Sequence, residues 1–185
     1  MNWPNRLSVL RIALAAAVAA LIYGGVPWAL ITALVLFVLA CFTDWLDGWM
    51  ARRYRIVTNF GKFIDPVADK LLVLSTMIAL CGRGSLPAWA CIVVLVRELA
   101  VDGLRLIAVE QGKVIAAGKL GKIKTTLQMV MLVAYLLAEA GLFGLHHSIL
   151  PELLLIAAMV MTLWSGADYF LKNRGVLMDG GRRTP

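Results

Sequence analysis

Apolar residues dominate the chain in long runs, and short segments of turn-forming residues separate each run from the next. Six runs approach the ~20 residues that an α-helix needs to cross a bilayer. They cover residues 7–24, 28–50, 66–82, 87–110, 124–143 and 149–171. The separators include Gly24 to Pro27, Gly82 to Gly84 and Gly141 to Gly144, where glycine and proline favour turns. The pattern predicts an all-α integral membrane bundle of six transmembrane helices in a single domain, residues 1–185.

Basic residues gather at alternate ends of these runs. They lie near the N-terminus, in the connections after the second and fourth runs, and in the tail: Arg6, Arg11; Arg52, Arg53, Arg55, Lys62; Lys113, Lys119, Lys122, Lys124; Lys172, Arg174, Arg182, Arg183. The three other connections contain only Arg83. Because lysine and arginine accumulate in cytoplasmic loops, we expect both termini to be cytoplasmic. A cleavable signal peptide in place of the first run would leave this alternation unexplained, so we expect the first run to remain as a span.

Composition agrees with this interpretation. The chain is 61% apolar with a mean hydropathy of +0.84, whereas soluble domains are nearer half apolar. The net charge of +7 follows from where the basic residues lie relative to the spans, so we expect no nucleic-acid partner. The three cysteines, Cys41, Cys81 and Cys91, have no CxxC spacing, which indicates neither a disulfide framework nor a thiolate metal site.

Four aspartates interrupt this apolar chain around the second connection. Asp44 and Asp47 are three residues apart, and Asp65 and Asp69 are four apart, so each pair shares one helix face. Pro66 is compatible with the first turn of a helix that begins there. The intervening connection is short, so we expect the second and third helices to be antiparallel neighbours with the two carboxylate pairs facing each other at the cytoplasmic edge of the bilayer.

An ionised group at the centre of a bilayer costs roughly 2.5 kcal/mol or more, so the four carboxylates require compensation. Divalent cations among them would allow all four to stay ionised. Oxygen-only ligands suit Mg²⁺ or Mn²⁺, and two such ions can clamp a phosphoryl group during transfer. The alternative is that the aspartates cap helices or pair with Arg52, Arg53 and Lys70. Four carboxylates paired at helical spacing favour a metal-dependent, phosphate-handling site that opens to the cytoplasm.

The residues around these aspartates form a long gapped motif, Asp44-x2-Asp47-Gly48-x2-Ala51-Arg52-x8-Gly61-x3-Asp65-x3-Asp69. This motif resembles the signature of the CDP-alcohol phosphatidyltransferases, with every fixed position filled. The resemblance extends nearly end to end, through PNRLSVLR, GKFIDPVADK, the Arg97-Glu98 pair, GKIKTT and TLWSGADY. One departure is Ser8, which stands where a threonine is often found and supplies the same hydroxyl.

The resemblance is greatest to the members that use glycerol 3-phosphate as acceptor. It implies transfer of a phosphatidyl group from CDP-diacylglycerol to sn-glycerol 3-phosphate, with release of CMP. Asp44, Asp47 and Asp65 would bind two divalent ions, and Asp69 would serve as both metal ligand and general base. Matching positions for the CDP-lipid are Asn5, Ser8, Gly48, Ala51, Arg52, Thr58 and Gly61. The family also implies a homodimer in the bacterial cytoplasmic membrane, with the active site facing the cytoplasm.

The acceptor's phosphate needs cations of its own. Arg97 and Arg105 are eight residues apart, about two helical turns, and arginine inside a span marks a functional site or a buried pair. We expect both arginines to bind glycerol 3-phosphate, and the resemblance adds Lys122. The alternative for the two arginines is ion pairing with Glu98 and Asp102. For Lys119 and Lys124, a solvated basic cluster is the favoured interpretation.

Two other functions remain open from the sequence. A related transferase with a different acceptor, such as inositol phosphate, phosphatidylglycerol or serine, would keep the carboxylate motif. The basic set around Arg105 argues for a phosphorylated acceptor, which disfavours serine. A divalent-cation channel or carrier would also place carboxylates in a membrane. Against a channel, Glu139 and Glu152 are isolated near the opposite side and do not continue the path.

Overall fold

The computed structural model describes residues 3–24, 26–54, 59–113, 115–116 and 118–178, with the side chains of 3–6, 27, 45, 47–54, 59–63 and 146–147 left aside. All secondary structure in this part of the chain is helical, as predicted. The elements are α1 (Trp3–Gly24), α2 (Pro27–Tyr54), α3 (Asn59–Gly82), α4 (Ala88–Glu110), α5 (Lys119–Glu139), η1 (Leu142–His147), α6 (Leu150–Lys172) and α7 (Arg174–Met178).

Each predicted run lies largely within one long helix, but α3 begins well before its run. The helix starts at Asn59, so Pro66 lies inside it and not in its first turn. The prediction for Pro66 is wrong because the polar residues before the apolar run already adopt helical backbone. An internal proline removes one backbone hydrogen bond and favours a local bend. In α3 this position falls between Asp65 and Asp69.

Three helices in the described part of the chain are long and apolar enough to cross a membrane. These segments are Leu7–Gly24 of α1, Lys119–Glu139 of α5 and Leu150–Lys172 of α6. In α2 the apolar stretch Trp28–Asp44 is shorter. Charged residues lower the hydropathy of α3 and α4, which carry Asp65, Asp69, Lys70, Arg97, Glu98, Asp102 and Arg105. The six-span topology therefore stays a prediction.

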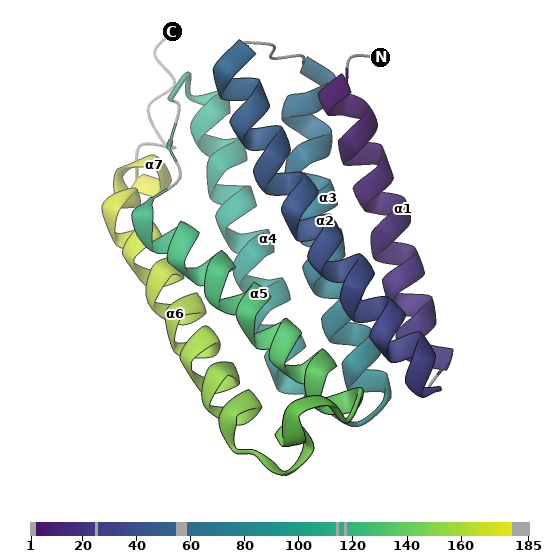
Figure 1. Cartoon of the computed structure of the whole chain (residues 1–185). Helices are drawn as coiled ribbons and strands as arrows, with labels where there is room; N and C mark the ends of the chain where they lie inside the picture. The colour runs from purple at the N-terminus through teal and green to yellow at the C-terminus, as the bar shows by residue number, and fades with distance from the viewer. Residues whose placement is uncertain (1–2, 25, 55–58, 114, 117, 179–185) are drawn as a thin grey trace, which may run out of the picture.

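The long helices run alternately up and down in one bundle (Figure 1). The start of α1, the end of α2, the start of α3 and the end of α4 lie at one end, towards which α7 also lies. The connections α1–α2, α3–α4 and α5–α6 lie at the opposite end. The first end therefore gathers the connections that are rich in Lys and Arg.

Helix α1 packs extensively against both α2 and α3, whereas α2 and α3 touch each other only slightly. The two helices are antiparallel, as expected, but the expectation that they pack closely against each other is wrong. The buried face of α1 carries the small side chains Ala15 and Val18, and small residues allow neighbouring helices to approach closely. Helix α1 thus packs against both helices and supplies side chains to the space between the aspartates of α2 and those of α3.

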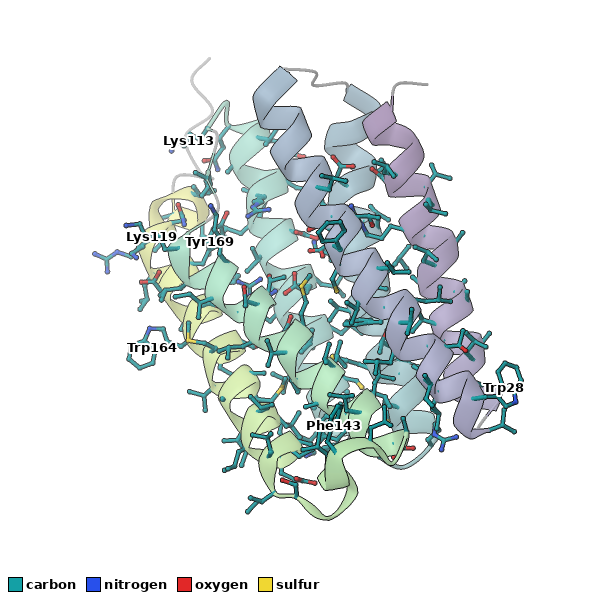
Figure 2. All side chains as sticks on the ribbon, in the orientation of Figure 1. Trp28, Lys113, Lys119, Phe143, Trp164 and Tyr169 are labelled. Carbon is teal, nitrogen blue, oxygen red and sulfur yellow. The ribbon has the colours of Figure 1, made fainter. Side chains whose placement is uncertain are left out.

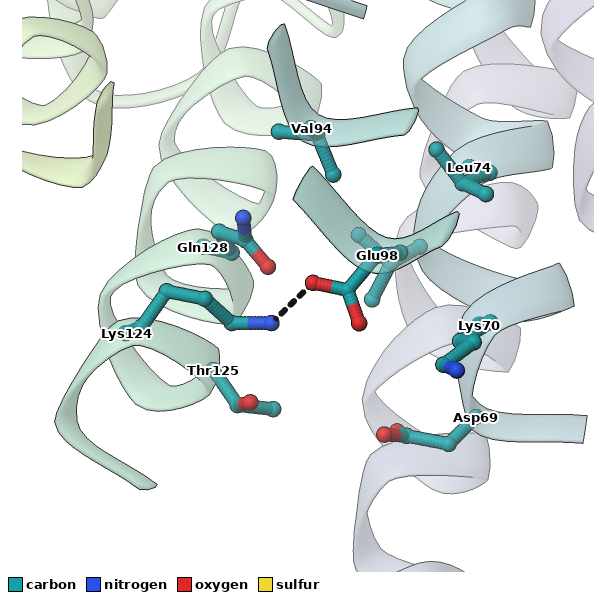
Figure 3. A pocket seen from close by; sticks show the side chains of 9 residues that line it. Asp69, Lys70, Leu74, Val94, Glu98, Lys124, Thr125 and Gln128 are labelled. Carbon is teal, nitrogen blue, oxygen red and sulfur yellow. Dashed lines mark hydrogen bonds and ion pairs between the residues drawn. The ribbon is translucent and has the colours of Figure 1, made fainter. Parts of the chain in front are cut away.

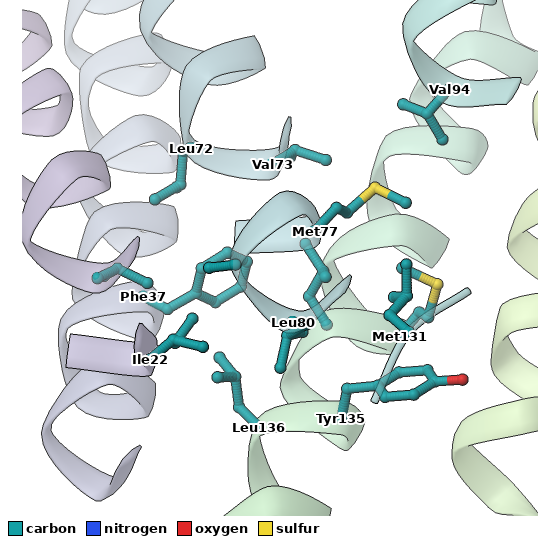
Figure 4. Close-up of a cluster of buried hydrophobic side chains, with 14 of the residues drawn as sticks. Ile22, Phe37, Leu72, Val73, Met77, Leu80, Val94, Met131, Tyr135 and Leu136 are labelled. Carbon is teal, nitrogen blue, oxygen red and sulfur yellow. The ribbon is translucent and has the colours of Figure 1, made fainter. Parts of the chain in front are cut away.

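A common apolar core joins α1–α3 to α4–α6 (Figure 4). Its buried side chains come from all six long helices and include Ile22, Phe37, Leu72, Met77, Leu80, Val94, Met131, Tyr135 and Leu136. The outer surface is also apolar: Phe143 is exposed, and Figure 2 shows Trp28 and Trp164 pointing away from the bundle. An apolar exterior around an apolar core is typical of a bundle that packs against lipid.

Charged side chains tie α4, α5 and α6 together in the interior. Glu98 of α4 accepts a hydrogen bond from Lys124 Nζ of α5 at 2.6 Å (Figure 3). It also accepts one from Arg97 Nη1 at 3.0 Å. Arg97 Nη2 donates to Ser165 Oγ of α6 at 3.3 Å. Lys124 is only 6% exposed, so its interpretation as part of a solvated cluster is wrong. Its position one helical turn before the buried Gln128 places it on the inner face of α5.

A second polar tie lies at the opposite end of the bundle. Arg83, in the α3–α4 connection, donates from Nε to Glu139 Oε2 of α5 at 2.9 Å and from Nη1 to the Ile22 carbonyl of α1 at 3.3 Å. Ser85 Oγ donates to Glu139 Oε1 at 2.5 Å. The connections at this end are thereby fixed to one another by charged hydrogen bonds.

Replacing Lys124 with methionine should destabilise the protein by about 3 kcal/mol. That is the low end of the cost of breaking a buried ion pair, because Glu98 keeps Arg97 as a partner. Lys122→Met is the matched control, since Lys122 is exposed on the same turn of α5. We expect the control to change stability by no more than ~0.5 kcal/mol. Thermal unfolding of both variants in the same detergent, followed by circular dichroism, measures the difference; equal melting temperatures would contradict the buried pair.

Candidate functional site

Helix α1 contacts two of the predicted metal-binding aspartates. Arg11 Nη1 lies 2.7 Å from Asp44 Oδ1 of α2, and Arg11 is 1% exposed. Ser8, one turn earlier and also buried, donates a hydrogen bond from Oγ to Asp65 Oδ1 of α3. The two α1 side chains therefore bring the ends of α2 and α3 to one side of α1.

Arg11 is a residue whose role the charge pattern missed. It was grouped with the basic residues that flank the first span, but it lies inside α1 and is buried. The available signal was its position within the apolar run 7–24, since arginine inside a span marks a functional site or a buried pair. Its guanidinium offsets part of the carboxylate charge at this end of the bundle.

Asp69 lies deeper along α3 and borders a small pocket between α3, α4 and α5 (Figure 3). Its Oδ1 is buried and has no hydrogen-bond partner among the described residues. Asp44 and Arg11 on one side, and Lys124 and Glu98 on the other, lie within electrostatic range of the carboxylate. An unpartnered buried carboxylate oxygen is costly, so this atom is poised to bind a cation or a hydroxyl.

Polar groups make up much of the pocket lining. The lining residues are Asp69, Lys70, Val73, Leu74, Val94, Glu98, Lys124, Thr125 and Gln128. Lys70 donates a hydrogen bond to Asp102 Oδ2, which ties α3 to α4 beside the pocket. Gln128 Nε2 donates to Thr162 Oγ1 of α6 at 3.0 Å. The pocket therefore has a fixed polar wall on every helix that borders it.

The carboxylates fit a hard divalent ion by chemistry and by the unsatisfied atom of Asp69. Aspartate oxygens are the ligands that Mg²⁺ and Mn²⁺ prefer. Among the described side chains, however, no group of three or more Asp, Glu, His or Cys is placed to hold a metal ion. Asp44 faces Arg11 and Asp65 faces Ser8, while the side chain of Asp47 lies outside the described part. The two-ion site therefore stays a prediction.

Most of the predicted CDP-lipid residues lie where side chains are not described. Asn5 belongs to α1, Gly48, Ala51 and Arg52 belong to α2, and Gly61 belongs to α3, while Thr58 lies outside the described residues. Ser8 is the member of the set whose contacts are defined, and it contacts Asp65. The helix ends that carry the described members of this set lie at the same end of the bundle as the aspartates.

The two predicted acceptor-binding arginines have different surroundings. Arg97 uses both terminal nitrogens on protein groups, Glu98 and Ser165, so the alternative of an ion pair with Glu98 is confirmed. Arg105 does not pair with Asp102, whose carboxylate accepts from Lys70. Its Nε donates to Tyr169 Oη of α6 at 3.1 Å instead. Lys122 is exposed, and the α5 lysine that lines the pocket is Lys124.

Comparison with known proteins identifies one family. The family model of the CDP-alcohol phosphatidyltransferases matches residues 1–164. The chain is 41% identical to the CDP-diacylglycerol–glycerol-3-phosphate 3-phosphatidyltransferase of Bacillus subtilis, with 93% of this chain and 95% of that protein covered. A protein of the same name from Salmonella choleraesuis is 37% identical over 96% of this chain and 98% of its own length.

A third relative is described as a probable phosphatidylglycerophosphate synthase, from Mycobacterium tuberculosis. It is 39% identical over 91% of this chain and 79% of its own length. The match of the family model covers the whole aspartate motif and five of the six long helices. The chain belongs to the CDP-alcohol phosphatidyltransferase family.

Proposed function

We propose that the protein transfers the phosphatidyl group of CDP-diacylglycerol to sn-glycerol 3-phosphate, forming phosphatidylglycerophosphate and CMP in phospholipid biosynthesis. Relatives that bear the name of this activity align over nearly their full length. The structural observation that carries the proposal is Asp69, whose unpartnered Oδ1 borders a pocket that also contains Lys70 and Lys124. A base beside fixed cations suits an acceptor with both a hydroxyl and a phosphate.

Two divalent ions, Mg²⁺ or Mn²⁺, would be held by Asp44, Asp47, Asp65 and Asp69. When bound, they would neutralise charge on the diphosphate, so that CMP leaves without a strong general acid. The contacts of Arg11 and Ser8 support this assignment, because they orient Asp44 and Asp65 before any ligand arrives. Such orientation lowers the cost of arranging the site.

Asp69 would act on the acceptor. Its carboxylate accepts the proton of the glycerol 3-phosphate hydroxyl as that oxygen bonds to the β-phosphorus and the bond from this phosphorus to the CMP oxygen breaks. A carboxylate near a cation is a weak base, so its contribution is to place the hydroxyl and to accept its proton late in the step. Asp69 lies about one turn further along α3 than Asp65, so the acceptor would bind between Asp69 and the aqueous end.

The acceptor's phosphate would be bound by Arg105 and Lys122, and Arg97 would not contact it directly. Arg105 keeps its terminal nitrogens free of partners within the described part of the chain, and these can grip two phosphate oxygens at once. Arg97 has both of its terminal nitrogens bonded to protein. We assign Arg97 to holding Glu98 and adding positive charge.

We further infer that all six long helices span the bacterial cytoplasmic membrane, with both termini and the site on the cytoplasmic side. The connections that share one end of the bundle carry the basic residues, which favours the cytoplasm for that end. CDP-diacylglycerol would enter from the surrounding lipid, with its cytidine in the aqueous mouth. A homodimer is proposed on the family resemblance alone.

A cation channel is not favoured by the structure. Glu139, an acidic residue at the opposite end, is bonded to Arg83 and Ser85. The pocket lining includes the apolar side chains of Val73, Leu74 and Val94 on that side. A permeating ion would therefore meet an apolar wall and then a carboxylate that is already neutralised.

Purified protein supplied with CDP-diacylglycerol should form lipid product with glycerol 3-phosphate and with none of serine, inositol phosphate or phosphatidylglycerol. Mass spectrometry of the extracted lipids identifies the product. Each acceptor is tested at the same concentration with wild type and with Asp69→Asn, which supplies the background. A different lipid product would replace the proposed acceptor, and no product with any acceptor would refute the proposed activity.

Removal of divalent ions should abolish CMP release, and Mg²⁺ or Mn²⁺ should restore it. Asp69→Asn should abolish CMP release at every ion concentration, because the amide neither carries charge nor accepts the proton. Mg²⁺ should also raise the melting temperature of wild type more than that of Asp69→Asn, since binding to the folded state stabilises it. Glu110→Gln, at an exposed carboxylate on α4, is the control and should behave as wild type. Turnover that persists in chelator would contradict the ion assignment.

Cysteine labelling in intact cells should distinguish which side of the membrane each end of the bundle faces. The three natural cysteines are first replaced by alanine. A cysteine at the exposed Phe143 position (Phe143→Cys) should react with a membrane-impermeant maleimide in intact cells. One between α4 and α5 (Ala116→Cys) should react only after lysis. The reverse pattern would invert the proposed orientation, and equal reaction at both positions would refute spanning by the intervening helices.

A further inference from the structure

Tyr169 of α6 is held rigidly against the guanidinium of Arg105. The tyrosine is 7% exposed and packs in a small apolar cluster with Val101, Leu104, Ala108 and Val176. Its Oη accepts a hydrogen bond from Arg105 Nε at 3.1 Å, and Arg105 Cζ lies 5.7 Å from the ring centroid. The ring cannot shift without disturbing this cluster, so the arginine rests against a fixed support.

The hydrogen bond from Nε determines which donors of Arg105 stay available. A guanidinium has five N–H donors, and the four on Nη1 and Nη2 form the edge that grips phosphate. In the described part of the chain neither Nη atom of Arg105 has a partner, because its one hydrogen bond uses Nε. Arg97 shows the opposite arrangement, with both Nη atoms bonded to protein and Nε unpartnered. Of the two arginines, Arg105 presents its outer edge to a ligand.

The partner of Arg105 is also electrically neutral. Asp102, one turn earlier on α4, could have neutralised Arg105, but its carboxylate accepts from Lys70 instead. A tyrosine hydroxyl fixes the orientation of a guanidinium without cancelling its charge. Arg105 follows the pocket residue Glu98 by seven positions, so it lies on the same helix face about 10 Å further towards the basic end.

We propose that Tyr169 is a positioning residue, which acts through Arg105 to hold the anion-binding edge of that arginine ready for the phosphate of the acceptor. This inference rests on the proposed function for the identity of the acceptor. Tyr169 lies beyond the segment that the family model matches, residues 1–164. It touches no reacting atom in this scheme and therefore affects binding of the acceptor more than the chemical step.

Tyr169→Phe removes the hydroxyl and keeps the packed ring. Loss of one hydrogen bond that orients a charged group should raise the apparent KM for glycerol 3-phosphate about three- to tenfold. The KM for CDP-diacylglycerol and kcat should change by less than about twofold, because no CDP-lipid contact is lost. Tyr135→Phe is the matched control: it also removes the hydroxyl of a buried tyrosine, in α5 near the opposite end, and should leave both KM values unchanged.

A double-mutant cycle distinguishes positioning from a merely structural effect. Arg105→Lys places a charge without the planar fork, so it should raise the KM for glycerol 3-phosphate by more than about tenfold. Adding Tyr169→Phe to Arg105→Lys should then have no further effect, because the hydroxyl has lost the group through which it acts. Additive effects of the two substitutions would overturn the proposal, as would equal changes in both KM values for Tyr169→Phe alone.

The same cycle measured as equilibrium binding separates this inference from the proposed function. Calorimetric titration of glycerol 3-phosphate into each variant, without CDP-lipid, requires no turnover. If wild type forms no phosphatidylglycerophosphate but binding is weakened non-additively, the proposed function fails while the role of Tyr169 stands. Normal turnover by wild type with unchanged binding in Tyr169→Phe gives the opposite result and removes Tyr169 from the site.

Discussion

The need to compensate charge inside an apolar bundle governs the interior of this protein. An ionised side chain away from water is costly, and the buried Arg11, Glu98 and Lys124 each have an oppositely charged partner on another helix. Arg11 meets Asp44, Lys124 and Arg97 meet Glu98, and Arg83 meets Glu139. These pairs set how the helices are rotated relative to one another, because each pair forms only when both faces point inward.

The exceptions to full compensation are concentrated in the region proposed as the site. Asp69 Oδ1 and the Nη atoms of Arg105 lack partners within the described residues, and they carry opposite charge. A ligand with a metal-bound diphosphate at one end and a phosphate-bearing acceptor at the other would satisfy both. The surrounding pairs, Lys70 with Asp102 and Lys124 with Glu98, hold these two groups on fixed helices. Stability is thus provided by the paired charges, and binding is left to the unpaired ones.

The length of the apolar runs predicted the helices well because an apolar run of bilayer length has few alternatives to a helix. It could not predict which helices touch. The placement of α1 against both α2 and α3 depends on the small buried side chain of Ala15. The burial of Lys124 depends on which face of α5 packs against α4, and the sequence does not specify that face. The start of α3 was missed because polar residues at a membrane surface can continue a helix without any apolar signal. The motif around Asp44 identified the family, yet the contacts of Ser8 and Arg11 with its aspartates required coordinates.

The ion pairs of α4 also have a consequence for how the protein is assembled in a bilayer. Taken alone, α4 carries Arg97, Glu98, Asp102 and Arg105, and a lone helix with such a sequence partitions poorly into lipid. Asp102 finds Lys70 on the preceding α3, but Glu98 obtains Lys124 only after α5 has been synthesised. Until then Glu98 has only Arg97 beside it on α4, so in the proposed topology the fourth helix gains its last ion pair when the fifth helix arrives. We expect these two segments to leave the insertion machinery together, as one neutralised unit.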